Sequence, residues 1–260
     1  MIESRSQDER GIAVGRMQHR RVVITGGASG IGRATAIKLA AQGARVLAVD
    51  VNDEAGLELA ALATAQKWDL SYFHADVSRE IDTTRAVETA IVNFGGIDVL
   101  VHAAGIMAGQ LEDIRNQDEA TWDRVIDINL KGAFFVAKQV AKVMVPAGTG
   151  VMILVASKAG VVIGSGSYPY GASKGGVHGL ALTLERHLGP HGIRVNDVCP
   201  GDVDTPLLRG SLAEAVARGG DPLAIEQTIR RLASPESVAD LLTYLASDDA
   251  ACVRGTIFTC

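Results

Sequence analysis

Cysteine and aromatic residues are scarce in this sequence. Its three cysteines, Cys199, Cys252 and Cys260, are widely spaced and form no C-x-x-C pair, which argues against a disulfide framework and against a cysteine zinc site. Free thiols are typical of the reducing cytoplasm, and we expect the protein there. Aromatic side chains are only 4% of the residues. The core must therefore consist mainly of aliphatic side chains, alanine and glycine, which favours buried parallel strands under close-packed helices.

Positive charge and long apolar runs are also lacking. The formal net charge is -5, and the basic residues form no cluster beyond Arg20, Arg21 and their neighbours, so we expect no nucleic-acid partner and no membrane surface. No segment approaches the roughly 18 apolar residues of a membrane-spanning helix. The six histidines show no metal-ligand spacing with acidic residues, so no metal is expected. The composition favours a globular protein that acts on a small molecule.

The chain length fits one large domain. The first 19 residues are charged and lack the apolar core of a signal peptide, so we expect a disordered N-terminal extension at 1–19. Residues 20–260 are within the size range of single α/β domains. We therefore predict one domain over 20–260.

Short β-branched runs alternate with longer segments of helical periodicity. The predicted strands are Arg21–Thr25, Arg45–Asp50, Leu70–Ala75, Ile97–His102, Val151–Ala156, Ile193–Cys199 and Thr256–Thr259. The predicted helices are near Ile31–Gln42, Glu54–Ala65, Arg79–Phe94, Thr121–Val145, Tyr170–Leu188 and Pro235–Leu245. Repeated strand-helix-strand units need right-handed crossovers and a mostly parallel sheet, whose ligands bind beyond the carboxyl ends of the strands. The prediction is a Rossmann-type doubly wound α/β fold with helices on both faces of a seven-stranded sheet.

One long stretch shows no strand pattern. It runs from Asp202 to about Ala233 and contains Gly210 and Gly219, so we predict an irregular lid at 202–233 that covers the binding site. Large apolar side chains in the lid and after the fourth predicted strand indicate a pocket with apolar walls. These side chains are Leu207, Leu208, Leu212, Ile106 and Met107.

A glycine-rich turn joins the first predicted strand to the first predicted helix. Gly26, Gly30 and Gly32 have the spacing G-x-x-x-G-x-G, with Ser29 and Ile31 between them. Glycines let the backbone turn tightly and approach a pyrophosphate, to which the helix N-terminus offers its N–H groups. The alternative is a tight turn without a ligand, but the strand before it and the helix after it favour dinucleotide binding.

Acidic residues end the second and third predicted strands. At Asp50 a carboxylate would accept hydrogen bonds from the adenosine ribose hydroxyls and would repel a 2′-phosphate. No lysine or arginine occupies positions 28, 29, 51 or 52 to neutralise such a phosphate, so the sequence predicts NAD rather than NADP. Asp76 and Val77 are placed to meet the adenine edge of the same ligand. The alternative for both aspartates is a simple helix cap.

A tyrosine and a lysine lie one helical turn apart. Tyr170 and Lys174 are separated by four positions, so their side chains leave one face of the predicted helix in the same direction. A free tyrosine has a pKa of about 10, and a nearby cation favours its phenolate, which suits a general acid or base. Ser157 follows the fifth predicted strand, where its hydroxyl can face the phenol and polarise a substrate oxygen. The alternatives are a surface helix pair and an ordinary turn serine.

Taken together, these motifs resemble those of the short-chain dehydrogenase/reductase family, from about Arg21 to Thr259. The turn from Thr25 to Gly32, Ser157, and the Y-x-x-x-K helix from Tyr170 to Lys174 occur in the family's order and spacing. The resemblance implies the strand order 3-2-1-4-5-6-7. It also implies a homotetramer, or a homodimer, assembled through two long helices.

The resemblance further implies roles for single residues. Tyr170 would be the general acid or base, Ser157 would orient the substrate, and Lys174 would bind ribose and lower the tyrosine pKa. Asn129 would hold a water in the proton relay. Further cofactor contacts are implied at Ala104, Gly105, Pro200, Gly201, Val203 and Thr205, the last two to the nicotinamide carboxamide. His102 departs from the family pattern, because an asparagine is usual at its position.

Three functions remain open at this point. The leading hypothesis is an NAD-dependent oxidoreductase that interconverts a secondary alcohol and a ketone, with a polyol, sugar, cyclic alcohol or hydroxy-ester as substrate. The second is an NADPH-dependent 3-oxoacyl-thioester reductase, against which Asp50 argues. The third is a catalytically silent NAD-binding scaffold, which the joint presence of Ser157, Tyr170 and Lys174 disfavours.

Overall fold

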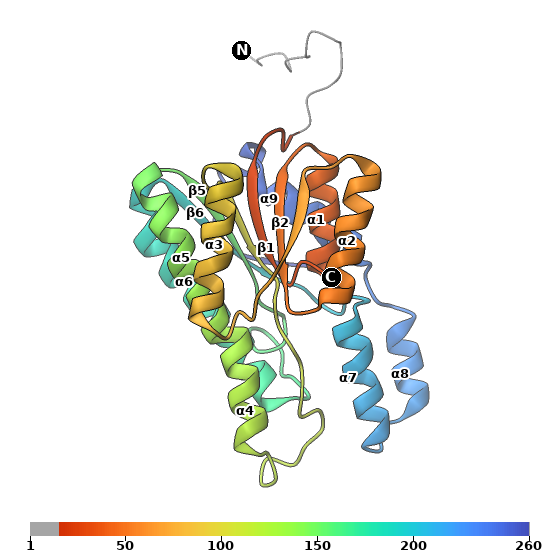
Figure 1. Ribbon diagram of the computed structural model, residues 1–260. Helices are drawn as coiled ribbons and strands as arrows, with labels where there is room; N and C mark the ends of the chain where they lie inside the picture. Colours follow the sequence, from red (N-terminus) through yellow and green to blue (C-terminus); the bar gives the residue numbers. More distant parts are fainter. Residues whose placement is uncertain (1–15, 260) are drawn as a thin grey trace.

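A seven-stranded parallel sheet forms the centre of the molecule (Figure 1). The computed structural model describes residues 16–259, the side chains of 222–225 excepted. The strands are β1 (Arg21–Thr25), β2 (Arg45–Asp50), β3 (Leu70–His74), β4 (Val99–His102), β5 (Gly150–Val155), β6 (Ile193–Cys199) and β7 (Gly255–Phe258). Their order is β3-β2-β1-β4-β5-β6-β7, and all pairings are parallel. The predicted Rossmann-type fold and strand order are therefore confirmed.

Helices cover both faces of this sheet (Figure 1). One face carries α3 (Glu80–Phe94), α5 (Gly132–Ala147) and α6 (Tyr168–Leu188), and the other carries α1 (Gly30–Ala41), α2 (Asp53–Gln66) and α9 (Pro235–Ala246). Two single turns, η2 (Gly189–His191) and η3 (Asp248–Ala250), follow α6 and α9. The remaining helices, α4 (Glu119–Ile126), α7 (Pro206–Ala217) and α8 (Pro222–Ile229), extend beyond one end of the sheet. This end is the one where the predicted site residues gather.

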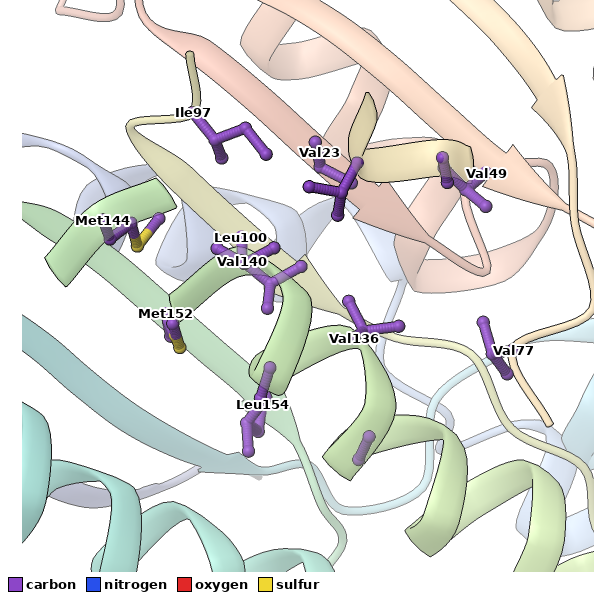
Figure 2. Packing of buried hydrophobic residues seen from close by; sticks show 14 of the residues in the cluster. Val23, Val49, Val77, Ile97, Leu100, Val136, Val140, Met144, Met152 and Leu154 are labelled. Carbon is purple, nitrogen blue, oxygen red and sulfur yellow. The ribbon is translucent and has the colours of Figure 1, made fainter. Parts of the chain in front are cut away.

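Alternate residues of the strands contribute to two apolar layers, one on each face of the sheet. In β1, Val23 belongs to the layer under α3, α5 and α6, while its neighbour Ile24 belongs to the layer under α1 and α9, because successive side chains of a strand point to opposite faces. Figure 2 shows the first layer, in which Val140 of α5 lies over Leu100 of β4 and near Leu154 of β5. Burial of one such side chain stabilises the fold by about 1.5–3 kcal/mol. The two layers thereby fix the positions of the strand ends.

The predicted helix at Thr121–Val145 is not one regular α-helix. A π-helical turn, η1 (Asp127–Lys131), separates α4 from α5. Such turns are uncommon and are often found at functional sites. This one contains Asn129, a predicted site residue.

The predicted lid contains two helices, α7 and α8, so the expectation of irregular structure there is wrong. Thr205 caps α7, since its side chain accepts a hydrogen bond from the Leu208 N–H at 3.2 Å. Pro206 occupies the first helical position, where the missing N–H costs nothing. A short parallel bridge between Val203 and Ala233 closes the base of the segment.

The N-terminal boundary differs in part from the expected one. Residues 1–15 of the expected extension lie outside the described residues, but 16–19 form a turn. Met17 is fully buried in the layer under α1, and the Arg20 N–H donates to the Met17 carbonyl at 3.0 Å. These four residues therefore pack as part of the domain. Within the described residues, no helix is long and apolar enough to cross a bilayer.

Candidate active site

A cavity of about 330 Å³ lies where the strands end, within the range of small-molecule pockets of about 300–1,000 Å³. Its wall contains the predicted residues Gly26, Ser29, Gly30, Ile31, Gly32, Asp50, Asp76, Val77, Ala104, Gly105, Ser157, Tyr170, Lys174, Pro200, Gly201, Val203 and Thr205. Asn129 is the one predicted site residue that is not in the wall. The sheet therefore brings residues from distant parts of the sequence into one cavity.

The glycine turn forms one end of the cavity. Gly26 and Gly30 have φ angles of +66° and +50°, which residues other than glycine rarely adopt. A Cβ atom on Gly32 would lie 2.0 Å from the Gly26 carbonyl oxygen, so a larger residue does not fit. The α1 N-cap, Ser29, makes no side-chain capping hydrogen bond. No side-chain cap therefore occupies the first N–H groups of α1, and an anion could accept hydrogen bonds from them.

Acidic side chains border the same end of the cavity. The Asp50 carboxylate accepts hydrogen bonds from the Ala28 N–H at 3.0 Å and the Asn52 N–H at 3.1 Å, which tie it to the glycine turn. Asp76 accepts from the N–H and the hydroxyl of Ser78, at 2.9 and 2.7 Å. The described wall contains no arginine, and its one lysine is Lys174. The described wall residues at this end therefore include no positively charged side chain.

Tyr170 and Ser157 both line the cavity. Tyr170 lies on the buried face of α6 and is only 7% exposed. Burial raises the pKa of Tyr170 to about 12; hydrogen bonding with the Ser157 side chain opposes this rise, and the negative charge of Asp202 adds to it. Ser157 also accepts from the Ala159 N–H at 3.1 Å. At neutral pH the phenol keeps its proton and can donate it to a bound oxygen.

Lys174 is buried beside the tyrosine. Its Nζ donates to the Val155 carbonyl oxygen at 2.7 Å and lies 5.8 Å from the centre of the Tyr170 ring. Burial lowers the pKa of Lys174 to about 8, against the opposing effect of the Asp197 and Cys199 side chains. Burial has the largest effect on the Tyr170 pKa and shifts it upward, and the lowering of that pKa by Lys174 stays a prediction.

Asn129 is fully buried behind the cavity wall. Its amide donates to the Ile106 carbonyl oxygen and to the Ser173 hydroxyl, each at 2.9 Å, and its oxygen accepts from the Ile106 N–H at 2.8 Å. The π-helical turn thus joins the chain after β4 to helix α6. The predicted water-holding role stays a prediction, because the observed partners of Asn129 are protein groups.

One part of the cavity wall is apolar. Ile106, Met107, Leu207 and Leu208 line it as predicted, whereas Leu212 does not. Sequence reasoning assigned no role to Asp202, which lies in the wall and acts on Tyr170. Its position directly after the predicted cofactor residues Pro200 and Gly201 was the available signal.

His102 ends β4 beneath the cavity. It is 1% exposed, and its Nδ1 lies 2.8 Å from the Thr25 hydroxyl. Burial lowers the pKa of His102 to about 3, and the charge of Lys174 adds to this effect. The imidazole is therefore neutral at neutral pH. The contact with Thr25 joins β4 to β1.

Comparisons with known proteins agree with this geometry. The family model described as short chain dehydrogenase matches residues 20–215. The chain is 36% identical over 253 residues to (+)-borneol dehydrogenase 2 of Salvia officinalis, covering 92% of this chain and 87% of that protein. It is 37% identical over 247 residues to 3-alpha-(or 20-beta)-hydroxysteroid dehydrogenase of Mycobacterium tuberculosis, covering 94% and 88%.

A solved structure shares the whole architecture. The crystal structure of levodione reductase superposes with a TM-score of 0.87 at 34% sequence identity, covering 93% of this chain and 95% of that chain. At this identity and coverage, the likeness extends beyond the sheet to the helices around the cavity.

Proposed function

The chain belongs to the short-chain dehydrogenase/reductase family of oxidoreductases, and on that premise we propose that it interconverts a cyclic, apolar secondary alcohol and its ketone with NAD(H). The observation that carries this proposal is the convergence of Ser157, Tyr170 and Lys174 with the glycine turn in one cavity. The apolar end of that cavity supports an apolar substrate. The names of the relatives, which give borneol and a hydroxysteroid, support a ring-bearing alcohol.

The residues present fit a nicotinamide dinucleotide. The uncapped first turn of α1 and the backbone at Gly26 and Gly30 offer N–H groups to a pyrophosphate, and Asp50 offers a carboxylate to the adenosine ribose. Val203 and Thr205 would hold the carboxamide at the other end. When bound, the nicotinamide ring supplies the acceptor or donor of the hydride.

The side chains of the chain itself account for the proton chemistry. The hydroxyls of Ser157 and Tyr170 hold the substrate oxygen between them. In ketone reduction the Tyr170 phenol donates its proton to that oxygen, and its high pKa keeps the proton available. In alcohol oxidation the phenolate accepts the proton, and the Lys174 ammonium stabilises the negative charge. The apolar wall excludes water from the reacting carbon.

The proposed preference for NAD is tested by cofactor binding. Wild-type protein should bind NAD more tightly than NADP by roughly tenfold or more, since Asp50 would repel the 2′-phosphate. In Asp50→Ala the preference should shrink, because the repulsion is lost. Calorimetric titration with both cofactors measures this. Tighter binding of NADP by the wild type contradicts the assignment.

The substrate class is tested by an NADH-absorbance assay. A panel of cyclic secondary alcohols, linear polyols and a 3-hydroxyacyl thioester is offered with NAD and with NADP. We expect the highest kcat/KM for a cyclic alcohol with NAD. Turnover confined to the thioester with NADP would establish the alternative reductase instead.

We further propose a homodimer or homotetramer assembled through the long helices. Trp122 of α4, Phe134 of α5 and Leu182 of α6 are 39%, 46% and 46% exposed, and we propose that they take part in the interface. Sedimentation analysis of wild type and Phe134→Glu should show an assembly that the variant weakens. A monomeric wild type contradicts this proposal.

We also propose a cytoplasmic location. Cys199 and Cys252 are free thiols, as is typical of proteins in a reducing compartment, while Cys260 lies outside the described residues. Fractionation of cells that express the protein tests the location. Recovery in an oxidising compartment contradicts it.

A further inference from the structure

A buried polar cluster lies behind the candidate active site. The side chain of Asp197 on β6 is fully buried, and its Oδ2 lies 2.5 Å from Nδ1 of His178 on α6. The thiol of Cys199 donates to the same oxygen at 3.4 Å. The other oxygen, Oδ1, has no hydrogen-bond partner within the described part of the chain. A buried carboxylate with so few partners is unfavourable unless it compensates a charge.

The cluster adjoins Lys174. Tyr170, Lys174 and His178 follow one another at four-residue steps on α6, so they form one stripe of the helix. Asp197 and Cys199 alternate with Val198 on β6, so both point toward α6. Val198 pairs with Val155, whose carbonyl oxygen accepts from Lys174 Nζ. The Lys174 ammonium therefore contacts the sheet next to Val198, the residue between Asp197 and Cys199 on β6.

The surrounding groups leave Asp197 as the counter-charge. Burial of Lys174 favours the neutral amine, and the negative charge of Asp197 opposes this effect and raises the lysine pKa. The Cys199 thiol has its pKa raised to about 12, and His102, on β4, has its pKa lowered to about 3, so both are neutral near pH 7. Asp202 acts on Tyr170.

His178, Asp197 and Cys199 are residue types that can bind a metal ion, but the distance between their ligand atoms argues against a metal site. Two ligands on one tetrahedral zinc, with bonds of about 2.0–2.2 Å, lie roughly 3.3 Å apart. The 2.5 Å between His178 Nδ1 and Asp197 Oδ2 is that of a short hydrogen bond. Histidine and thiol thus orient the carboxylate.

We propose that Asp197 is a positioning residue that supplies the buried counter-charge of Lys174, with His178 and Cys199 fixing its orientation. It touches neither the cavity nor a reacting atom and acts only through the lysine. Its consequence for turnover rests on the function proposed above: Lys174 must stay cationic to stabilise the Tyr170 phenolate.

The first test measures the lysine directly, without turnover. Protein with 13C-labelled lysine is titrated by NMR, and the Lys174 signal is assigned by its loss in Lys174→Met. In Asp197→Asn, an almost isosteric change, the Lys174 midpoint should fall by about one pH unit or more, since a nearby opposite charge shifts a pKa by about 1–3 units. The matched control is Thr256→Val, which removes a 3.3 Å contact to His178 without changing charge, and its midpoint should stay in place. An unchanged midpoint in Asp197→Asn overturns the proposal.

A second variant keeps the test decisive if Asp197→Asn does not fold. His178 is 27% exposed in its side chain, so His178→Arg can be accommodated and places a permanent cation beside the carboxylate. The Lys174 midpoint should again fall. If the midpoint stays in place in a folded His178→Arg protein, Asp197 does not act on the lysine and the proposal is wrong.

In the active enzyme, the pH–rate profile provides a second readout. Since Asp197 acts through Lys174, its removal should move the limb of the Asp197→Asn profile that reports the Lys174 charge to lower pH. A lower rate with that limb unmoved indicates a merely structural role and contradicts the proposal. If the wild type turns over no alcohol or ketone, the proposed function fails, while the NMR titration still decides the role of Asp197.

Discussion

The cavity has two walls that are held in different ways. The wall on the sheet side consists mainly of residues at or just after the ends of strands β1 to β6, and backbone pairing fixes their positions. The lid wall, formed by the start of α7, is joined to the chain after β4 by side chains. Gln110 donates to the Ser211 hydroxyl at 2.6 Å, and Arg218 pairs with Glu112. Local backbone geometry therefore determines the first wall, and long-range side-chain contacts hold the second.

Glycine is required by packing in one wall and not in the other. In the sheet wall, Gly32 has no room for a side chain, because a Cβ atom would lie 2.0 Å from a backbone oxygen. In the lid wall, Gly210 lies inside α7, and a Cβ atom there would meet nothing within 4 Å. The first glycine is required by close packing. The second only lowers the helix propensity of the lid.

The largest effect on cofactor binding is expected from Gly32→Ala. The clash with the Gly26 carbonyl must move the turn, so dinucleotide affinity should fall by roughly 100-fold or more, about 3 kcal/mol. Calorimetric titration with NAD measures this. The matched control is Gly210→Ala, which should leave NAD affinity unchanged and stabilise the protein by about 0.5–1 kcal/mol. Equal NAD affinity in Gly32→Ala and wild type would mean that the turn does not bind the cofactor.

The next largest effect concerns the buried ammonium of the sheet wall. The pKa of Lys174 in the folded protein, about 8, lies below its ordinary value of 10.5, so the folded protein holds this proton less tightly than the unfolded chain does. The charge therefore destabilises the fold below pH 8, and this cost disappears as the pH rises toward 10.5. In Lys174→Met this pH-dependent cost is absent, so wild type should gain roughly 1–3 kcal/mol of stability relative to the variant between pH 7 and pH 10.

Urea unfolding of Lys174→Met and wild type at several pH values checks this prediction. The stability of wild type relative to the variant should stay constant below pH 8 and rise between pH 8 and 10. A difference that is independent of pH would show that the lysine is not under electrostatic strain.

A smaller effect is expected in the lid wall. Ser211→Ala leaves the buried Gln110 amide without its hydroxyl partner, which should weaken closure by about 1–3 kcal/mol. We expect the KM for the alcohol to rise while NAD affinity stays unchanged. Arg218→Met removes an exposed ion pair worth at most about 1 kcal/mol and serves as the control. If Ser211→Ala changes NAD affinity as strongly as substrate KM, the two walls are not independent.

The same contrast explains what could be predicted from the sequence. The bounds of β1, β2 and β6 coincide with the predicted ones, because buried parallel strands appear as continuous β-branched runs. The glycine turn is equally local, since its spacing and flanking elements suffice to identify it. The order of the strands came from the family resemblance and not from periodicity.

Other features had weak signals or none. The Thr205-Pro206 pair is an N-cap and first helical position, but Thr205 was interpreted only as a cofactor contact, so α7 was missed. Nothing in the residues around Asn129 distinguishes a π-helical turn from regular helix. The upward shift of the Tyr170 pKa follows from burial by residues far apart in sequence, which no local pattern encodes.

The central claim is that the Tyr170 hydroxyl transfers the proton while the rest of the cavity holds cofactor and substrate. Single-turnover measurement of NADH formation from NAD and an alcohol, in wild type and in Tyr170→Phe, tests it most directly. Phenylalanine keeps the ring, so NAD affinity should be unchanged while the rate falls by about 100-fold to 10,000-fold. A Tyr170→Phe protein that forms NADH at the wild-type rate would contradict the account.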